Sequence, residues 1–172
     1  LIVIIMKRSF LLLFTFCFLS LPNSFSQIPE ALKTWGFNSD PEHIDGKYRM
    51  VNGVSGNALK LDGFTTEISE SPEVLEGLNS SFTIEAWVAM AAYPWNWCPV
   101  VAQRNDVAGG KDHAGGFSME IGPRGELGFR IFVEGNEVFC VSEKFAVGLF
   151  EWTHVAASFE EGEGMRIFIN GR

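Results

Sequence analysis

The chain has 172 residues, 47% of them hydrophobic and 20% charged, with 21 acidic against 13 basic side chains and a formal net charge of −8. A protein this acidic is repelled by nucleic-acid phosphates and by anionic lipid, which argues against nucleic acid and membrane surfaces as partners. The three histidines stand singly in the sequence, so no transition-metal site is indicated.

The first 26 residues have the composition of a secretory signal peptide. Met6 to Arg8 is a short basic start, Ser9 to Leu21 is an apolar run, and Ser24 to Ser26 offers small residues where a signal peptidase cleaves. The apolar run is shorter than the roughly 20 residues that cross a membrane. We therefore expect export to the periplasm or the extracellular space, with no membrane insertion after cleavage. Residues 1–5 precede the start Met6, and we expect them to be an upstream extension without a structural role.

The remaining part, residues 27–172, has the length of one domain. Two of the thirteen basic residues lie in the signal, so this part carries 11 basic against 21 acidic residues and a net charge of −10. It keeps two cysteines, Cys98 and Cys140, in a compartment where disulfides persist. Whether they pair or stay free depends on the geometry of the fold, and both alternatives stay open at this point.

Apolar and polar residues alternate through most of this domain. From Ser81 to Met90, Phe82, Ile84, Ala86 and Val88 share one face, which is typical of a half-buried strand. The same pattern recurs in Pro99–Arg104, Gly116–Ile121, Glu126–Val133, Glu137–Ser142, Trp152–Phe159 and Met165–Asn170. Glycine, proline and asparagine lie between these segments, and only Pro72 to Asn79 could form a single helical turn. Short strands at this spacing predict an all-β, two-sheet antiparallel sandwich.

Five segments of the chain together resemble the laminin-G-like group of the concanavalin A-like lectin and glucanase superfamily. They are Trp35 to Phe37, Gly56 to Gly63, Phe82 to Val88, Glu151 to Ala157 and Arg166 to Gly171, in that order. The resemblance covers nearly the whole of residues 27–172. It implies a jelly roll and a non-catalytic module of the kind often joined to a glycosidase, sulfatase or adhesin domain in secreted bacterial proteins.

The last three residues, Asn170-Gly171-Arg172, follow a predicted strand. Asn-Gly in this position predicts a two-residue hairpin turn. The resemblance implies further strands after such a turn. We therefore expect residues 27–172 to be a sandwich that is incomplete at its C-terminus, and the full-length chain to carry a further domain.

The resemblance extends to glucanases, which carry their catalytic carboxylates in an E-x-D-x-E run on one strand. This chain has no such run. Glu120 and Glu126 flank a turn and are expected to be solvated edge charges, and Glu85 has no second acid beside it in the sequence. Retaining glycoside hydrolysis needs two carboxyl groups about 5–5.5 Å apart, so we expect this segment not to be an enzyme and to require no cofactor.

The resemblance also raises the hypothesis of a calcium site, because modules of this group often hold one calcium ion in a loop. Asn105, Asp106 and Asp112 lie in the turn-rich stretch from Arg104 to Gly116 and carry the oxygen ligands that calcium takes. The alternative is a solvated glycine-rich loop.

Aromatic residues alternate in one proline-containing stretch. Tyr93, Trp95 and Trp97 could form a rigid platform on which the apolar faces of sugar rings stack. The alternative is a buried plug at one end of the sandwich. The leading functional hypothesis is thus a carbohydrate-binding or adhesion module whose partner is a glycan or cell-surface polymer. A structural spacer or protein-contact domain and a glucanase of unfamiliar site layout are the alternatives.

Overall fold

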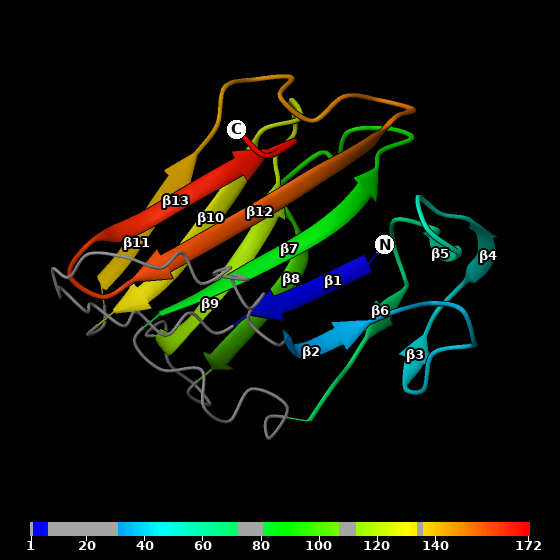
Figure 1. Cartoon of the computed structure of the whole chain (residues 1–172), viewed down its shortest axis with the longest axis horizontal. Coiled ribbons are helices and arrows are strands. Elements are labelled where there is room, and N and C mark those ends of the chain that lie inside the picture. Colours follow the sequence, from blue (N-terminus) through cyan, green and yellow to red (C-terminus); the bar gives the residue numbers. More distant parts are fainter. Residues whose placement is uncertain (1, 7–30, 72–80, 107–112, 134–135) are drawn as a thin grey trace, which may run out of the picture.

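The computed structural model describes residues 2–6, 31–71, 81–106, 113–133 and 136–172 (Figure 1). Within these ranges the chain forms strands, turns and loops without a helix, and every strand ladder is antiparallel. The predicted all-β class is therefore confirmed. The short helical turn considered for Pro72 to Asn79 lies outside the described residues. A membrane-spanning helix is not found in the part of the chain that was described.

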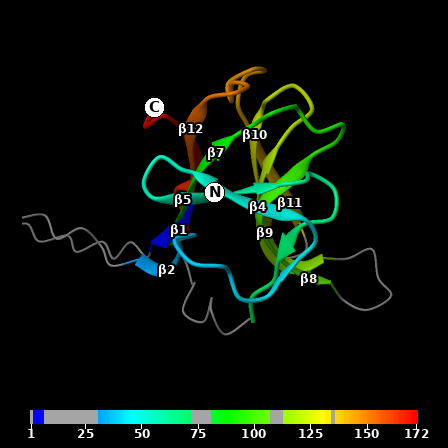
Figure 2. The ribbon, with the colours of Figure 1, turned by 90° about the vertical axis from the view of Figure 1, so that its right-hand side faces the viewer.

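Two large sheets form the body of the molecule, and Figure 2 shows them from the side. The five-stranded sheet has the order β13 (Gly164–Ile169), β12 (Trp152–Glu160), β7 (Ser81–Ala89), β1 (Ile2–Met6) and β2 (Ala31–Trp35). The four-stranded sheet has the order β11 (Asn136–Val141), β10 (Leu127–Val133), β9 (His113–Ile121) and β8 (Cys98–Asp106). The bounds of β7 to β13 agree within a few residues with the strands that the alternating pattern predicts, whereas β1 and β2 were not predicted from that pattern.

Two small sheets complete the fold. Strand β3 (Ile44–Asp45) pairs with β6 (Glu67–Ile68), and β4 (Tyr48–Asn52) pairs with β5 (Asn57–Leu61). Figure 1 shows them together at one side of the sandwich. The loop between β5 and β6 is held by Asp62, whose carboxylate accepts hydrogen bonds from the amides of Phe64 and Thr65 and from the Thr65 hydroxyl.

The core lies between the two large sheets and consists of the inward-facing residues of four strands, β7, β9, β10 and β12, together with Val147. Its members are Phe82, Ile84, Ala86, Val88, Phe117, Met119, Ile121, Leu127, Phe129, Ile131, Val147, Val155 and Ala157. Phe82 is central, because its ring contacts Phe117, Phe129 and Phe159 at centroid distances of 5.1, 6.2 and 6.0 Å. This arrangement of two packed sheets is the β-sandwich that the sequence predicts.

The N-terminal segment differs from the prediction. Residues 2–6 form β1, which lies between β7 and β2 and pairs with both. We expected residues 1–5 to have no structural role. The physical reason for the difference is that Ile2–Met6 is an apolar run rich in β-branched residues, a sequence that favours a fully paired central strand. Most of the predicted signal peptide, residues 7–26, lies outside the described residues, so the signal remains a prediction.

The turn after β13 confirms the hairpin prediction. Asn170 and Gly171 have φ angles of 50° and 78°, the pair of positive values that a type I′ turn requires. The amide of Arg172 donates to the carbonyl of Ile169 at 3.1 Å, and the amide of Ile169 donates back to the Arg172 carbonyl at 2.9 Å. The last residue thus begins to pair with β13.

Candidate functional site

The outer face of the four-stranded sheet carries an unusual set of side chains. Residues directly opposite one another in an antiparallel ladder lie on the same face. Ser118 lies opposite Arg130, Glu120 opposite Gly128, and Arg130 opposite Phe139. Because their neighbours along the strands, such as Met119 and Phe129, fill the core, these residues face away from it.

A charged network crosses this outer face. Arg130 Nη2 lies 3.6 Å from Glu120 Oε2, and Arg130 Nη1 forms a hydrogen-bonded ion pair with Glu137. The guanidinium also stacks on the ring of Phe139, with 4.2 Å from Cζ to the centroid. Arg130 is therefore held on three sides, and it fixes the orientation of Phe139.

The two glutamates that flank the β9–β10 turn are buried, and the expectation of solvated edge charges is wrong. Glu120 is only 2% exposed and Glu126 only 7%. Glu126 Oε2 accepts the amide hydrogen of Arg124 at 2.8 Å, and Glu126 Oε1 lies 3.7 Å from Arg124 Nε. The reason for the error is that alternation shows which face a residue occupies but not whether a loop covers that face.

The cover is an aromatic pair. Trp97 meets Phe139 edge to face, with ring centroids 5.1 Å apart and an interplanar angle of 88°. Both rings lie against the backbone of Gly128, where an added Cβ would be 2.7 Å from Trp97 and 2.8 Å from Phe139. Trp97 also lies over Gly122, with 2.9 Å to an added Cβ there. These two glycines are therefore required for the rings to approach the sheet so closely.

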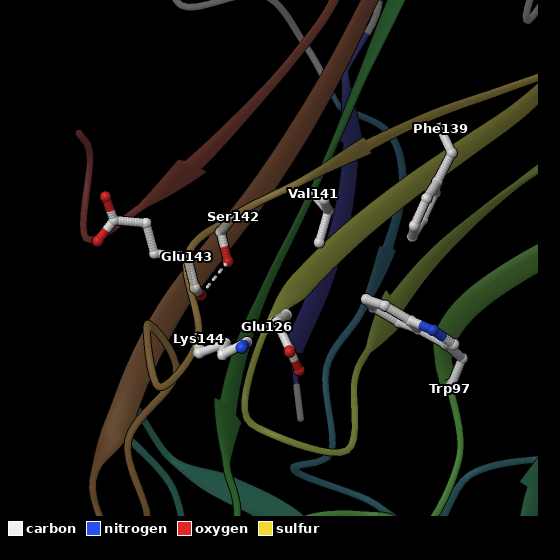
Figure 3. A pocket seen from close by; sticks show the side chains of 7 residues that line it. All are labelled: Trp97, Glu126, Phe139, Val141, Ser142, Glu143 and Lys144. Atoms are coloured by element: carbon white, nitrogen blue, oxygen red, sulfur yellow. Dashed lines mark hydrogen bonds between the residues drawn. The ribbon is translucent and has the colours of Figure 1, made fainter.

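Beside the aromatic pair lies a hollow of about 610 Å³. Its lining residues are Trp97, Glu126, Phe139, Val141, Ser142, Glu143 and Lys144, and we call it the β10–β11 groove. Figure 3 shows the carboxylate of Glu126 between the aromatic pair and the ammonium of Lys144. The segment after β11 is held close by Ser142, whose hydroxyl accepts the Leu127 amide at 2.9 Å. The groove thus combines apolar rings with charged and hydroxyl groups on a rigid sheet.

The three aromatic residues singled out in the sequence do not form one platform. Tyr93 is half-buried, donates its hydroxyl hydrogen to the Val147 carbonyl at 3.1 Å and packs on the ring of Phe145, as the plug alternative predicts. Trp95 is 89% exposed. Trp97 is the member that reaches the groove. Phe139 was not among the predicted site residues, and its only signal in the sequence is its outward position in an alternating strand.

The two cysteines are far apart in the four-stranded sheet. Cys98 begins β8 at one edge and Cys140 lies in β11 at the other, so about three strand spacings, roughly 14 Å, separate them. A disulfide needs Cα atoms about 4.4–6.8 Å apart, and both thiols are free. The disulfide alternative is therefore wrong. Partial burial raises the pKa of both thiols, and the Glu120 charge raises the pKa of Cys98 further, which opposes a nucleophilic role.

The calcium hypothesis falls mainly on residues about which little is described. Asn105 and Asp106 are in β8, but their side chains are not among those described, and Asp112 lies outside the described residues. Among the described residues, no group of three or more His, Cys, Asp and Glu side chains is placed to hold a metal ion. Calcium at this loop remains a prediction.

The outer face of the five-stranded sheet holds a different cluster. His154 Nε2 lies 3.3 Å from Glu85 Oε2, and the His154 ring is 5.2 Å from that of Trp87. Asn170 Oδ1 accepts the His154 amide hydrogen at 3.0 Å, which joins this cluster to the last turn. The partner of Glu85 is thus a histidine, and the two side chains are about three-quarters buried against the sheet.

Comparison with known proteins gives one match. A family model described as the concanavalin A-like lectin/glucanases superfamily matches residues 62–172. None of the curated proteins and none of the solved structures compared with the chain matches it. The matched region contains β7 to β13 and therefore every residue of the β10–β11 groove.

Proposed function

The chain belongs to the concanavalin A-like lectin/glucanase superfamily, and from that premise we propose that it binds glycan in the β10–β11 groove as a non-catalytic carbohydrate-binding module. Membership supports a carbohydrate-binding or adhesion-type module in general. The location of the binding site and the absence of catalysis are our proposals.

The observation that carries the proposal is the Trp97–Phe139 pair. A sugar ring presents apolar C–H groups on its faces and hydroxyl groups around its edge, so it needs an aromatic surface flanked by hydrogen-bonding groups. Trp97 and Phe139 supply the surface, and Glu126, Ser142 and Lys144 supply the flanking groups within the same hollow. The pair is fixed beforehand by Gly128 and Arg130, which lowers the entropic cost of binding.

The burial and contacts of the two glutamates, Glu120 and Glu126, support a binding role rather than a catalytic one. The Glu120 carboxylate is only 2% exposed and lies 3.6 Å from Nη2 of the Arg130 guanidinium. Glu126 accepts an amide hydrogen from its own turn. A general acid in glycoside hydrolysis must reach the glycosidic oxygen, and the burial of Glu120 opposes such access.

One observation favours a protein-contact domain as the second candidate. The loop between β11 and β12 exposes Phe145 by 65% and Phe150 by 80%, and both have a φ of 63°, which is unusual for an aromatic residue. A protein partner would bury these exposed rings, which favours this candidate. Under this alternative, removal of both phenylalanine rings would abolish a protein interaction and leave glycan binding unchanged.

We also propose that the chain is secreted, on the basis of the signal-like residues 6–26, and that it acts beside a further domain of the same protein. Cleavage after residue 26 would remove β1, so β7 and β2 would then lose the strand that pairs with both. Its partner is then a glycan or cell-surface polymer outside the cytoplasm. If that further domain degrades polysaccharide, the binding module keeps the enzyme close to its polymer substrate.

The test is a titration of the chain against a panel of polysaccharides by affinity electrophoresis and calorimetry. We expect saturable binding to at least one polymer, and loss of that binding in Trp97→Ala. Phe64→Ala is the matched control, because Phe64 is 89% exposed in the β5–β6 loop and outside the groove. Binding that survives Trp97→Ala and disappears with Phe64→Ala would contradict the proposal. Release of reducing sugar by the chain would contradict its non-catalytic part.

A further inference from the structure

We infer that the β10–β11 groove selects uncharged glycans and rejects polymers that carry carboxylate or sulfate groups. This inference rests on the proposed function and adds the chemical class of the ligand to it.

The first reason is the charge of the lining. Of the seven residues that line the groove, Glu126 and Glu143 are acidic and Lys144 is the only cation. The whole chain adds to this local excess, with a formal net charge of −8. An anionic polymer would therefore approach against a repulsive potential.

The second reason is that the neighbouring arginines already have carboxylate partners. Arg130 lies between Glu120 and Glu137 on the same sheet face. Arg124 Nε lies 3.7 Å from the buried Glu126. Recognition of sulfate or carboxylate groups usually uses arginines that are free to bind them in a bidentate manner. At either of these two arginines an anionic ligand would have to displace an existing ion pair.

The third reason is the kind of hydrogen bond that the groove can accept. An ionised carboxylate is an acceptor only, whereas a sugar hydroxyl can donate. Glu126 lies in the middle of the groove in Figure 3, beside the aromatic pair. A neutral sugar stacked on Trp97 can donate hydroxyl hydrogens to this carboxylate, but a uronate or sulfate group at the same place would meet like charge.

The experiment uses polymer pairs that share a backbone. Each neutral polysaccharide of the panel is tested beside its carboxymethylated, sulfated and aminated derivatives, with the full chain and by calorimetry. We expect the anionic derivative of any bound polymer to bind at least about tenfold more weakly, and the deficit to shrink at about 0.5 M salt, where charges are screened within about 4 Å.

A charge-reversal variant links the selectivity to the groove. Glu143 is exposed, and we expect Glu143→Lys to strengthen binding of the anionic derivative by at least about threefold, in the range of surface charge pairs. Glu163→Lys is the matched control, because Glu163 is also exposed but lies on the β12–β13 turn outside the groove. Glu163→Lys should change the affinity for the anionic derivative by less than half as much as Glu143→Lys does.

The outcomes separate this inference from the proposed function. An anionic derivative that binds as tightly as its neutral parent would overturn the selectivity and leave glycan binding in place. A preference for the aminated derivative over the neutral parent would also overturn it. If no polymer of any charge binds, the proposed function fails and the selectivity fails with it. Equal gains for Glu143→Lys and Glu163→Lys would assign the effect to net charge and contradict selection by the groove.

Discussion

Gly128 is the position where one added methyl group should damage the proposed site with the least change to the fold. In Gly128→Ala the new Cβ would lie 2.7 Å from Trp97 and 2.8 Å from Phe139, so both rings must move away from the sheet. The φ of Gly128 is not in the left-handed region. Alanine is therefore acceptable to the backbone, and the effect of the substitution comes from the displaced rings.

The size of the effect follows from two opposing contributions. Overpacking costs about 1–3 kcal/mol, and replacing glycine by alanine in a strand returns about 0.5–1 kcal/mol of backbone entropy. Phe139 is 36% exposed and can rotate outward, so the overpacking cost should lie near its lower end. We expect a net loss of stability of about 0.5–2 kcal/mol together with a loss of glycan affinity of about tenfold, which is on the order of one stacking contact.

The assay combines urea denaturation with a glycan titration of the same samples. Gly36→Ala is the control, because Gly36 has no atoms within 4 Å of an added Cβ and no positive φ. It should leave the affinity unchanged. Full glycan affinity in Gly128→Ala would refute the reasoning that these two rings form the binding surface, and a stability loss without an affinity loss would assign the pair a purely structural role.

Other predictions follow from single contacts. Trp97→Ala should lower the free energy of unfolding by about 2 kcal/mol in urea denaturation, since Trp97 is half-buried and loss of a fully buried tryptophan costs about 3–5 kcal/mol. Trp95→Ala should change the free energy of unfolding by no more than about 0.5 kcal/mol, because Trp95 is exposed. Arg130→Leu should cost about 2–4 kcal/mol, because the buried Glu120 loses its cation, and a change below about 1 kcal/mol would contradict the ion pair. Hydrogen bonds from the Thr65 side chain and the amides of Phe64 and Thr65 hold the pKa of Asp62 well below its usual range. This depressed pKa stabilises the fold at pH values above the ordinary aspartate pKa of about 3.9. The stabilisation is lost as the pH falls through the pKa of Asp62 in the folded protein. Asp62→Asn should therefore lose less stability than the unchanged protein between neutral and acidic pH.

The strands were predictable because alternation depends on local sequence. In β7 the residues at 82, 84, 86 and 88 are all buried, as the period-two pattern requires. The Asn170–Gly171 turn was predictable for the same reason, since two adjacent positive φ values need residues of this kind.

The site was less predictable because it depends on strand order and on loops. Trp97, Glu120 and Phe139 are distant in the sequence and come to the same face of the sheet only because β8, β9, β10 and β11 are neighbours. Strand order likewise separates Cys98 from Cys140 by the full width of the sheet. Alternation could place Glu120 on the outer face, but its burial depends on the loop that brings Trp97 over Gly122 and Gly128.

The most direct test of the account is a nuclear magnetic resonance titration that follows the indole N–H signals of the five tryptophans during addition of a bound oligosaccharide. If glycan binds in the β10–β11 groove, the Trp97 signal moves with saturation, because Trp97 lines the groove. The signals of Trp87 and Trp152, which belong to the five-stranded sheet, should stay in place. A shift confined to Trp87 or Trp152, with Trp97 unmoved, would place the ligand on the opposite sheet and contradict the account.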